Sequence, residues 1–574
     1  MINFSDTKML EFITMFRVMG LVLMVTQGCL AANQKHVDEQ CRFTRYSTLC
    51  VDTMTGLGSE NQKPDILSAL INKTILETQL PTSYFTKFTT ALHVDEAQHV
   101  NSITGLPTKL NTFLANVYDV DSILEESFLF FLSFLAKKHN VSHAGYCEEL
   151  LSMSLKRLDQ SLLALKNSRN KNKHDIQTWI SAALTYQQAC KDSADSHNFS
   201  NGDLMGQISQ KMDYLSQLGS NTLALANRIP GELTHFTKSR RLAKADRVFP
   251  EWLSAKDRKL LQVPTVKANA VVAKDGSGNY KTISEAINAA SGGRFVIYVK
   301  AGVYKEKIRT NKDGITMVGD GKYSTIIVGS DSVNGGSSMP GSATFTVTGD
   351  GFIARDIGFQ NTAGPQGEQA LALYVASDHS VFYRCSIAGY QDTLYALSLR
   401  QFYRECDIYG TVDFIFGNAA AVFQSCTLAL RRPSGYNVIL ASGRSDPGQN
   451  TGFSVQNCRI VPSSDLSPVK HSFESYLGRP WKQYSRAVVM ESTIDNAIAS
   501  RGWVEWPGEG GYSKSLYFAE YANVGPGAGT AGRVTWPGFH VIGRDEAAKF
   551  TVDRFIAGNL WLPSTGVTFI SGLQ

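Results

Sequence analysis

The chain has 574 residues, 43% hydrophobic and 19% charged, so it is long enough for two or more domains that each bury a core. The formal net charge of +5 and the isoelectric point near 8.5 are mild. They fit a protein that meets an acidic polymer, although such a balance mostly reflects solubility. No cluster of Lys and Arg alternates with aromatic residues, which argues against a nucleic-acid-binding protein.

The first thirty residues follow the order of an export signal. Lys8 and Arg17 precede an apolar run at Val18–Val25, and small residues follow around Ala31. This order predicts a cleaved signal peptide over residues 1–31. The alternative is a membrane anchor, but the run is well short of the ~20 apolar residues that a span needs. No later segment is long enough either, so we expect an exported protein without a stable membrane span.

Cysteines and glycosylation motifs agree with export. One of the nine cysteines falls in the signal, and each half of the remaining chain holds four. Even numbers allow each half to be crosslinked separately in an oxidising compartment. Three Asn-X-Ser/Thr motifs beyond the signal predict glycosylation in the first half. They begin at Asn72, Asn140 and Asn198.

The first half of the chain has the texture of a helical bundle. From about residue 65 to 227 apolar residues recur at three- and four-residue intervals, and glycine is sparse. Amphipathic helices are predicted over Ser122–Leu132, Tyr146–Leu165 and Ile176–Cys190. Helices of this kind favour an antiparallel bundle, which we expect to occupy residues 32–228.

A linker is expected at residues 229–262. It carries two dibasic pairs, Arg240-Arg241 and Arg258-Lys259. Such pairs in a linker can be solvated surface. In an exported precursor we interpret them as sites for a processing protease, so that the mature protein begins near Gln262.

The second half, residues 263–574, reads as short strands separated by Gly, Asn and Asp, and it contains a repeat. One pattern recurs around Cys385, Cys406 and Cys426, which lie 21 and 20 residues apart. It consists of an apolar residue, two further residues, the cysteine, one residue and a second apolar residue. A fainter copy surrounds Cys458. Strand repeats of this length predict a solenoid, here a parallel β-helix whose turns lie ~4.8 Å apart.

The repeat brings two carboxylates together. Asp392 and Asp413 each follow a repeat cysteine by seven residues, so they occupy equivalent positions on successive turns. Two carboxylates ~5 Å apart repel by roughly 3 kcal/mol at an effective dielectric of ~20, which is ~2 pKa units. One is then protonated while the other stays ionised, as a nucleophile with a general acid requires. A lone aspartate is more often a turn cap, but a register-matched pair beside Gln391 and residues 414–418 favours catalysis.

Six short blocks in this half resemble the signature motifs of plant pectin methylesterases. They are Ala354–Ile357, Asn361–Pro365, Gln369–Leu373, Gly389–Leu394, Gly410–Asn418 and Leu477–Trp481. The resemblance extends over about Val271 to Trp561. It implies a right-handed parallel β-helix that removes methyl groups from the galacturonate esters of pectin, without a metal or organic cofactor.

The same resemblance assigns roles in the reaction. Asp413 matches the nucleophile that attacks the ester carbonyl. Asp392 matches the acid that protonates methanol and then the base that activates water. Gln391 matches the donor that stabilises the oxyanion, and Gln369 a second donor or substrate contact. An oxyanion donor of this kind is worth about 3–4 kcal/mol.

Three further residues are assigned to substrate or nucleophile. Arg479 resembles the guanidinium that pairs with the nucleophile and keeps it ionised, a role for which Lys is a poor substitute. Trp481 resembles a wall on which a sugar ring stacks. Thr344 is a candidate contact, although the chain departs from many relatives in carrying Ser338-Met-Pro340 just upstream.

The first half is similar to the inhibitors of pectin methylesterase and invertase, which are four-helix bundles. The resemblance implies disulfides Cys41–Cys50 and Cys147–Cys190, and a domain that inhibits the enzyme in the same chain. In the repeat we expect Cys406–Cys426 because the two lie on adjacent turns, with Cys385–Cys406 almost as plausible. The partners implied are pectin, separate inhibitor proteins and a processing protease, in the plant cell wall.

Other functions stay open on the sequence alone. A β-helical polygalacturonase would place carboxylates about a glycosidic bond, and a pectate lyase would need a calcium cluster with a basic residue. Neither pattern is visible. A non-catalytic pectin-binding or inhibitor protein would tolerate loss of the aspartates, yet both are present.

Overall fold

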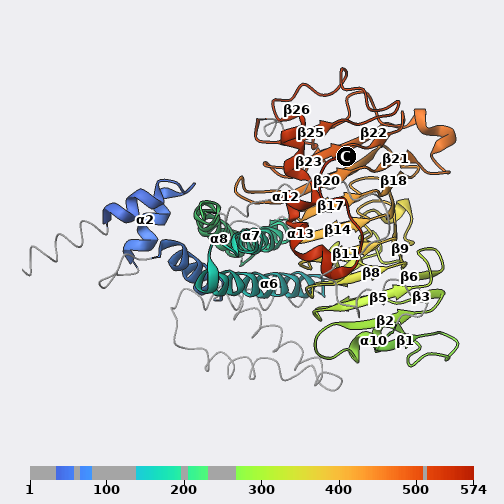
Figure 1. Ribbon diagram of the computed structural model, residues 1–574, viewed down its shortest axis with the longest axis horizontal. Coiled ribbons are helices and arrows are strands. Elements are labelled where there is room, and N and C mark those ends of the chain that lie inside the picture. Colours follow the sequence, from blue (N-terminus) through green and yellow to red (C-terminus); the bar gives the residue numbers. More distant parts are fainter. Residues whose placement is uncertain (1–33, 57–64, 80–137, 196–203, 231–266, 509–513) are drawn as a thin grey trace, which may run out of the picture. The chain divides into compact units, whose positions relative to one another are not determined.

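The computed structural model describes residues 34–56, 65–79, 138–195, 204–230, 267–508 and 514–574. The chain divides into two compact units, Met1–Glu232 and Leu233–Gln574 (Figure 1). In these ranges no helix is both long and apolar enough to cross a membrane. The predicted signal peptide and both dibasic pairs lie outside the described residues.

The first unit is helical. Residues 66–79 pack with three long helices around a core that includes Leu70, Leu158, Ile180 and Leu223. Two of the three predicted helices are confirmed, and Ser122–Leu132 lies outside the described residues. Residues 34–41 are also helical, and the named helices are α2 (Ser47–Gly56), α6 (Lys138–Ser168), α7 (Lys173–Asp195) and α8 (Leu204–Asn227).

Two disulfides crosslink this unit as predicted. Cys41 is bonded to Cys50, with the Cα atoms 5.6 Å apart. Cys147 in α6 is bonded to Cys190 in α7, with the Cα atoms 4.8 Å apart. Of the glycosylation candidates, Asn72 is exposed on the helical segment 66–79, Asn140 lies in α6, and Asn198 falls outside the described residues.

The second unit is a right-handed parallel β-helix, as predicted, made of three parallel sheets. Sheet A has eleven strands, sheet B eight and sheet C seven. Sheet A contains β1 (Ala270–Val272), β2 (Phe295–Val299), β5 (Ile315–Gly319), β8 (Ile353–Arg355), β11 (Ser380–Tyr383), β14 (Arg400–Arg404), β17 (Ala420–Gln424), β20 (Gly452–Gln456), β23 (Arg486–Met490), β25 (Tyr517–Tyr521) and β26 (Phe539–Val541).

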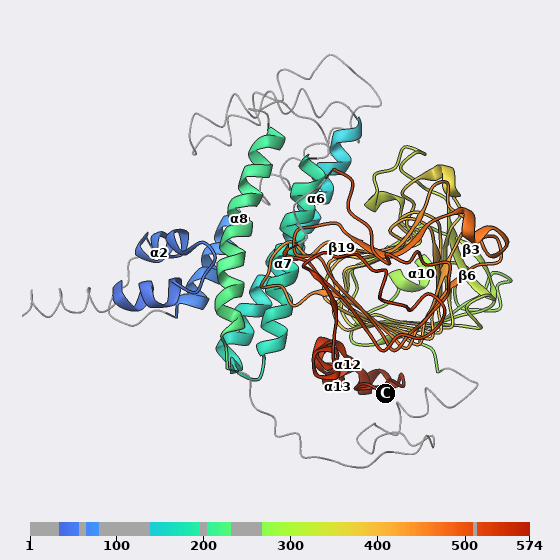
Figure 2. The same cartoon turned by 90° about the horizontal axis from the view of Figure 1, so that it is seen from above.

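Sheets B and C complete each turn of the coil. Sheet B contains β3 (Gly302–Lys305), β6 (Thr325–Gly329), β9 (Gly358–Asn361), β12 (Ser386–Ala388), β15 (Asp407–Gly410), β18 (Thr427–Leu430), β21 (Arg459–Pro462) and β24 (Thr493–Ile494). Sheet C contains β4 (Ile308–Thr310), β7 (Phe345–Val347), β10 (Leu373–Val375), β13 (Leu394–Ala396), β16 (Ile415–Gly417), β19 (Asn437–Ser442) and β22 (Ser475–Pro480). Figure 2 looks along the coil and shows the turns stacked on one outline.

Stacked side chains fill the inside of the coil. The rings of Phe382 and Tyr403 on β11 and β14 are parallel with centroids 5.0 Å apart, and Phe423 on β17 continues the stack at 4.6 Å. All three are fully buried. Because side chains alternate along a strand, neighbours such as Val381 and Phe402 point to the outer face of sheet A.

Cysteines mark the corner between sheets A and B. Each repeat cysteine follows a residue in the left-handed region, with φ between 51° and 55° at Arg384, Glu405, Ser425 and Asn457. This turn aims the cysteine side chain inward. The four cysteines, Cys385, Cys406, Cys426 and Cys458, are buried free thiols that form no disulfide.

The predicted disulfide Cys406–Cys426 is therefore wrong, and so is its alternative Cys385–Cys406. Neighbours on parallel strands lie about 4.8 Å apart with parallel side chains, whereas the Cβ atoms of a disulfide are about 3.5–4.5 Å apart. Each thiol instead donates to a main-chain carbonyl of the preceding turn. These bonds join Cys385 to Ala354 at 3.5 Å, Cys406 to Phe382 at 3.3 Å, Cys426 to Tyr403 at 3.4 Å and Cys458 to Phe423 at 3.3 Å.

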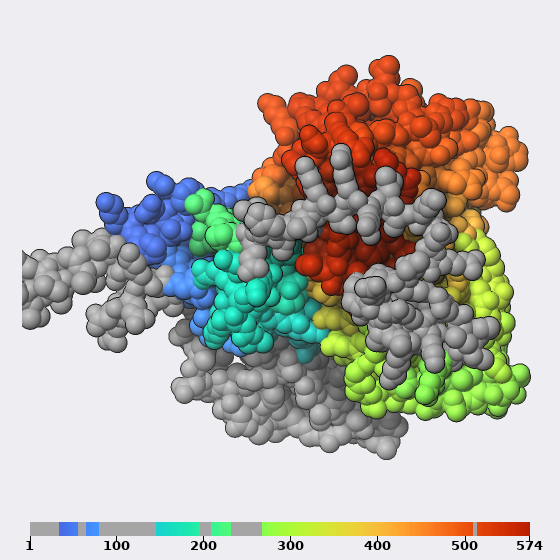
Figure 3. Space-filling view, in the orientation of Figure 1, coloured from blue at the N-terminus to red at the C-terminus, as the bar shows by residue number. Residues whose placement is uncertain are grey.

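Helices cover one end and one face of the coil. The helix α10 (Ile283–Asn288) begins with a capping box between Thr282 and Glu285 and lies inside the outline in Figure 2. The C-terminal segment contains α11 (Arg544–Ala547), α12 (Val552–Ile556) and α13 (Gly558–Trp561), and it packs apolar side chains on the outer face of sheet A. Figure 3 shows this segment as a dark red part of the surface.

Candidate active site

The two aspartates lie at the corner between sheets B and C on successive turns. Leu394 of β13 pairs with Ile415 of β16, so Asp392 and Asp413, each two residues earlier, occupy the same place in the coil. The predicted register is confirmed. Both residues are in the left-handed region, with φ of 59° and 49°, which aspartate tolerates better than most side chains.

The main chain around the pair is held from both sides. The amide of Asp392 donates to the carbonyl of Val412 at 3.0 Å, which joins the two turns directly. The hydroxyl of Thr393 lies 3.0 Å from the carbonyl oxygens of both Tyr390 and Tyr409. Gly410 is required for this corner, because a Cβ atom there would lie 2.1 Å from that of Phe414. The carboxylates therefore sit on a closely packed backbone.

Arg479 supplies the positive charge. It lies on β22, opposite Ala441 of β19, and its side chain reaches Asp413. Its Nε atom donates to Oδ1 of Asp413 at 2.9 Å and its Nη2 atom to Oδ2 at 2.5 Å. Asp413 is 5% exposed and Arg479 7% exposed. The ion pair that the resemblance implied is thus present and nearly removed from solvent, where charge-assisted bonds are strong.

Burial and Arg479 separate the two acids. Burial raises the pKa of Asp392 well above its ordinary value, the charge of Asp413 adds to the rise, and Arg479 opposes it. Burial also raises the pKa of Asp413, but the hydrogen bonds and charge of Arg479 counteract that rise. Asp392 is therefore the member of the pair that holds a proton, and Asp413 is the one that ionises first.

Two glutamines lie beside the pair. Gln391 directly precedes Asp392 and is half-buried, and its carbonyl accepts a bond from the amide of Ala370 on the preceding turn at 3.3 Å. Gln369 therefore lies next to Gln391 across the turns. Its Oε1 atom is buried and has no hydrogen-bond partner among the described residues. Both glutamines are half-buried and lie at the corner that carries the aspartates.

Trp481 forms a half-buried aromatic surface two residues beyond Arg479. Its ring meets that of Phe416 edge-on, with centroids 5.9 Å apart, and the Nζ atom of Lys482 lies 5.6 Å from its centre. Gly443 leaves room for the ring, because a Cβ atom there would lie 2.8 Å from it. The predicted role of Trp481 as a wall for a sugar ring stays a prediction.

The structure speaks against the substrate contact predicted for Thr344. Its side chain is 1% exposed, and its hydroxyl donates to the main-chain carbonyl of Gln360 at 3.0 Å. Its Oγ1 atom also packs against Gly329 inside the coil. A hydroxyl that is buried and already bonded does not face a polymer.

Three residues near the site carried no motif in the sequence. The hydroxyl of Tyr436 accepts a bond from Nη1 of Arg479 at 2.8 Å, and the guanidinium lies 4.2 Å from the ring centre of Trp506. Arg431 donates to the carbonyl of Gly389 at 3.0 Å and to the hydroxyl of Tyr390 at 2.7 Å, so it braces the segment that leads into Gln391. No pattern in the sequence pointed to Trp506, which is a half-buried tryptophan in the structure.

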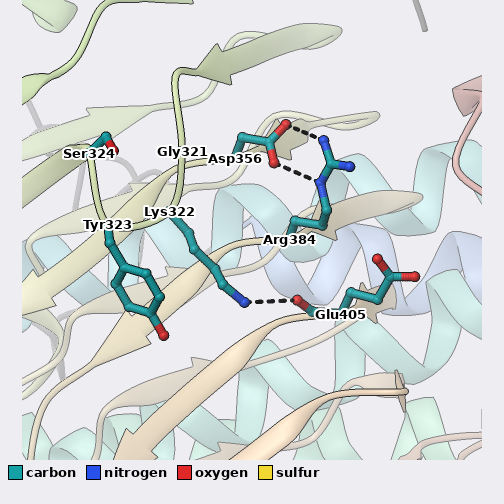
Figure 4. Close-up of a pocket in the computed structure, with 7 residues that line it drawn as sticks. All are labelled: Gly321, Lys322, Tyr323, Ser324, Asp356, Arg384 and Glu405. Carbon is teal, nitrogen blue, oxygen red and sulfur yellow. Dashed lines mark hydrogen bonds and ion pairs between the residues drawn. The ribbon is translucent and has the colours of Figure 1, made fainter. Parts of the chain in front are cut away.

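A surface hollow of about 380 Å³ lies elsewhere, at the corner between sheets A and B (Figure 4). Arg384 donates two hydrogen bonds to Asp356, at 2.7 and 2.6 Å. Lys322 pairs with Asp407 at 2.6 Å. The hollow lies at a different corner of the coil from the aspartate pair, and its Arg384 and Lys322 are already paired with carboxylates. The lining residues are Gly321, Lys322, Tyr323, Ser324, Asp356, Arg384 and Glu405.

The fold is a parallel β-helix, and its candidate site is a pair of carboxylates stacked on successive turns, one of them paired with an arginine. The family model "Pectinesterase" matches residues 269–559, and the model of the plant invertase/pectin methylesterase inhibitor matches residues 124–225. The chain therefore belongs to the pectinesterase family and carries an N-terminal domain of the inhibitor family.

Similar proteins are named as pectinesterases or pectin methylesterases, and the name of the first also mentions the inhibitor. "Probable pectinesterase/pectinesterase inhibitor 54" of Arabidopsis thaliana is 48% identical over 91% of this chain and 90% of its own length. "Pectinesterase 2" of Citrus sinensis is 49% identical over 74% of this chain and 81% of its own length. Among solved structures, the pectin methylesterase from carrot is 53% identical and matches with a TM-score of 0.53, over 54% of this chain and all of its own.

Proposed function

We propose that this enzyme hydrolyses the methyl esters of galacturonate residues in pectin and releases methanol. The observation that carries the proposal is the stacked pair Asp392 and Asp413, of which only Asp413 is bonded to Arg479. This gives an ionised nucleophile next to a protonated acid. The names of the similar proteins support pectin as the substrate.

In the first half of the reaction the Asp413 carboxylate attacks the ester carbonyl carbon. The carbonyl oxygen becomes an oxyanion, to which the amide of Gln391 donates, with Gln369 as a second donor. Collapse of this intermediate breaks the bond to the methoxy group, which takes the proton of Asp392 and leaves as methanol. Asp413 is then bonded to the galacturonyl group as an anhydride, and Asp392 is ionised.

In the second half Asp392 acts as a base. It takes a proton from water, and the resulting hydroxide adds to the acyl carbon. The anhydride bond breaks, Asp413 becomes a carboxylate again, and the product leaves as galacturonic acid, which gives its proton to the solvent and becomes galacturonate. The proton remains on Asp392, so the site returns to its starting state and the net reaction is hydrolysis of one ester.

The polymer is held beside the pair by Trp481. Its half-exposed ring offers an apolar face to a sugar ring. Arg479 binds the nucleophile and not the polymer, because its N–H donors already face Asp413 and Tyr436.

We propose that the protein acts in the plant cell wall after secretion. The signal-like N-terminus, the two disulfides and the exposed Asn72 support an oxidising, glycosylating route. Residues 1–31 would then be removed as a signal peptide, and Asn72, Asn140 and Asn198 would carry glycans.

The helical domain, residues 32–228, would act as an inhibitor of the β-helix, residues 263–574. A tethered inhibitor has an effective concentration of order millimolar for a short flexible linker, so a modest affinity suffices. Cutting the linker 229–262 by a processing protease at Arg240-Arg241 or Arg258-Lys259 would end this effect. Separate proteins of the inhibitor family are the expected partners of the released enzyme.

Product analysis on methyl-esterified pectin tests the proposal. The full chain is assayed before and after proteolysis within the linker 229–262, and methanol, new reducing ends and unsaturated uronates are measured in parallel. We expect methanol alone, with a higher rate after cleavage. Reducing ends would indicate a polygalacturonase, and unsaturated products a lyase. Absence of methanol from both forms would contradict the proposed activity, and equal rates would contradict inhibition within the chain.

A further inference from the structure

The guanidinium of Arg479 is held on three sides. Its Nε and Nη2 atoms face Asp413, and its plane lies 4.2 Å from the ring centre of Trp506. The remaining nitrogen, Nη1, donates to the hydroxyl of Tyr436 at 2.8 Å. Tyr436 thus binds the edge of the guanidinium that Asp413 does not use.

Tyr436 is itself well supported. Its ring meets that of Tyr476 edge-on, with centroids 6.3 Å apart. The next residue, Asn437, begins β19, and its amide nitrogen donates to the carbonyl of Glu474 at 2.9 Å. The side chain of Asn437 also bonds the hydroxyl of Ser475 at 3.2 Å. These contacts join the start of β19 to β22, the strand that carries Arg479, so the backbones that carry Tyr436 and Arg479 are bonded to each other.

The chemistry of the acceptor matters. A buried N–H without a partner costs free energy, so an acceptor for Nη1 stabilises the largely buried guanidinium. A carboxylate there would compete with Asp413 for the positive charge of Arg479. A phenol hydroxyl accepts the bond without a charge, so it holds Nη1 and leaves the charge of the guanidinium to Asp413.

We propose that Tyr436 is a positioning residue that holds Arg479 in the orientation in which it keeps the nucleophile Asp413 ionised. The inference rests on the proposed function for the role of Asp413 in methanol release. The contact itself is independent of that role. Tyr436 acts only through Arg479, and the substrate does not have to touch it.

Removal of one oxygen atom tests the proposal. Tyr436→Phe keeps the ring and loses the acceptor, so Arg479 loosens and Asp413 ionises less readily. We expect kcat to fall about tenfold with little change in KM, because a bond to a charged group is lost. The acid limb of the kcat profile is expected to move up by about one pH unit, since one unit equals a tenfold change in the protonation equilibrium. Tyr436→Gln, which offers an amide oxygen, should restore part of the loss.

The matched control is Tyr476→Phe. Tyr476 packs on Tyr436, but its hydroxyl donates to Glu474 at 2.5 Å and not to Arg479. This variant perturbs the same patch and should leave the acid limb in place. A limb that moves equally in both variants, or an unchanged rate and limb in Tyr436→Phe, would overturn the proposal.

A second readout does not depend on activity. Because burial raises the pKa of Asp413 in the folded protein, its contribution to stability is present at low pH and is lost as the pH rises through the folded value. Tyr436→Phe raises that pKa further, so its Tm deficit relative to the parent should widen as the pH rises from the folded pKa of Asp413 in the parent to that in the variant. In an Asp413→Asn background the deficit should no longer vary with pH.

The two readouts separate the two proposals. If the parent released no methanol, the proposed function would fail, and the Tm profiles would still decide whether Tyr436 acts on the Arg479–Asp413 pair. A Tm deficit that is constant with pH and unaffected by Asp413→Asn would show a packing role only, and would overturn the inference.

Discussion

The two units of this chain use cysteine in opposite ways. In the helical unit all four described cysteines are paired, and one bond joins α6 to α7. In the β-helix the four cysteines form an inward row of thiols, each bonded to a carbonyl of the previous turn. The difference follows from how each unit acquires its core.

Helices in a bundle satisfy their own backbone and are held together by side chains alone. A crosslink that closes a loop then limits the unfolded chain and adds stability. Turns of the coil bind each other through main-chain ladders along all three sheets and through stacked rings. Side chains that point into the coil therefore stabilise the fold, whereas the candidate catalytic pair lies at a corner between two sheets.

The largest effect on activity is expected at the corner that holds the aspartate pair. Asp413→Asn replaces the nucleophile by an amide that cannot attack the ester, so methanol release should fall by about 10⁴-fold or more. The Tm should stay within a few degrees. The matched control is Asp356→Asn, which also lies in the left-handed region but at the corner between sheets A and B, and should keep normal turnover. Near-normal methanol release by Asp413→Asn would show that Asp413 is not the nucleophile.

An inward position should show the reverse pattern. Phe423→Ala removes a ring stacked 4.6 Å from Tyr403 and leaves a cavity, which should cost about 3–5 kcal/mol in the free energy of unfolding of the β-helix. Calorimetry should show the β-helix transition shifted and that of the helical unit unchanged. Phe423→Leu, which keeps more of the volume, should cost less. If Phe423→Ala shifted both transitions together, the two units would not unfold independently.

Crosslink removal should affect only the helical unit. Cys147→Ala combined with Cys190→Ala opens a loop with a sequence separation of 43 and should cost about 2–4 kcal/mol there. A reducing agent should lower the transition of the helical unit in the parent and leave that of the β-helix where it was. The double variant Cys406→Ala with Cys426→Ala is the control, because it replaces two cysteines of the β-helix without removing a disulfide. A β-helix transition that fell on reduction would mean that its thiols are crosslinked after all.

The smallest expected effect concerns the aromatic wall. Gly443→Ala places a methyl group 2.8 Å from the ring of Trp481 and pushes it from its place beside Phe416. A loss of roughly 1 kcal/mol in substrate binding would raise KM about fivefold with kcat little changed. Steady-state kinetics on methylated pectin measures this. A fall in kcat with constant KM would indicate instead that the shift reaches Asp413.

Much of this arrangement could be predicted from repeat spacing. The intervals of 21 and 20 residues place equivalent residues on successive turns, which is why Asp392 and Asp413 were brought together correctly. Spacing predicts which residues align on successive turns but not the distance between their side chains. It therefore could not exclude a disulfide between Cys406 and Cys426. The resemblance to the family, and not spacing, identified Arg479 and Trp481.

Residues that meet only in three dimensions escaped the sequence. Tyr436 lies 43 residues from Arg479 in a connection before β19, and no periodicity links the two. Thr344 was chosen by its block, but its place next to Gly329 depends on how neighbouring turns pack. Single side chains in connections are where sequence patterns carry least information.

The division of roles between ionised Asp413 and protonated Asp392 is tested most directly by the pH dependence of kcat/KM for methanol release. Activity should rise as Asp413 ionises and fall as Asp392 loses its proton, and burial should displace both limbs above the ordinary aspartate range near 3.9. Asp392→Asn should lower the rate and abolish the falling limb. A parent profile without a falling limb, or a falling limb that survives in Asp392→Asn, would contradict the two-carboxylate account.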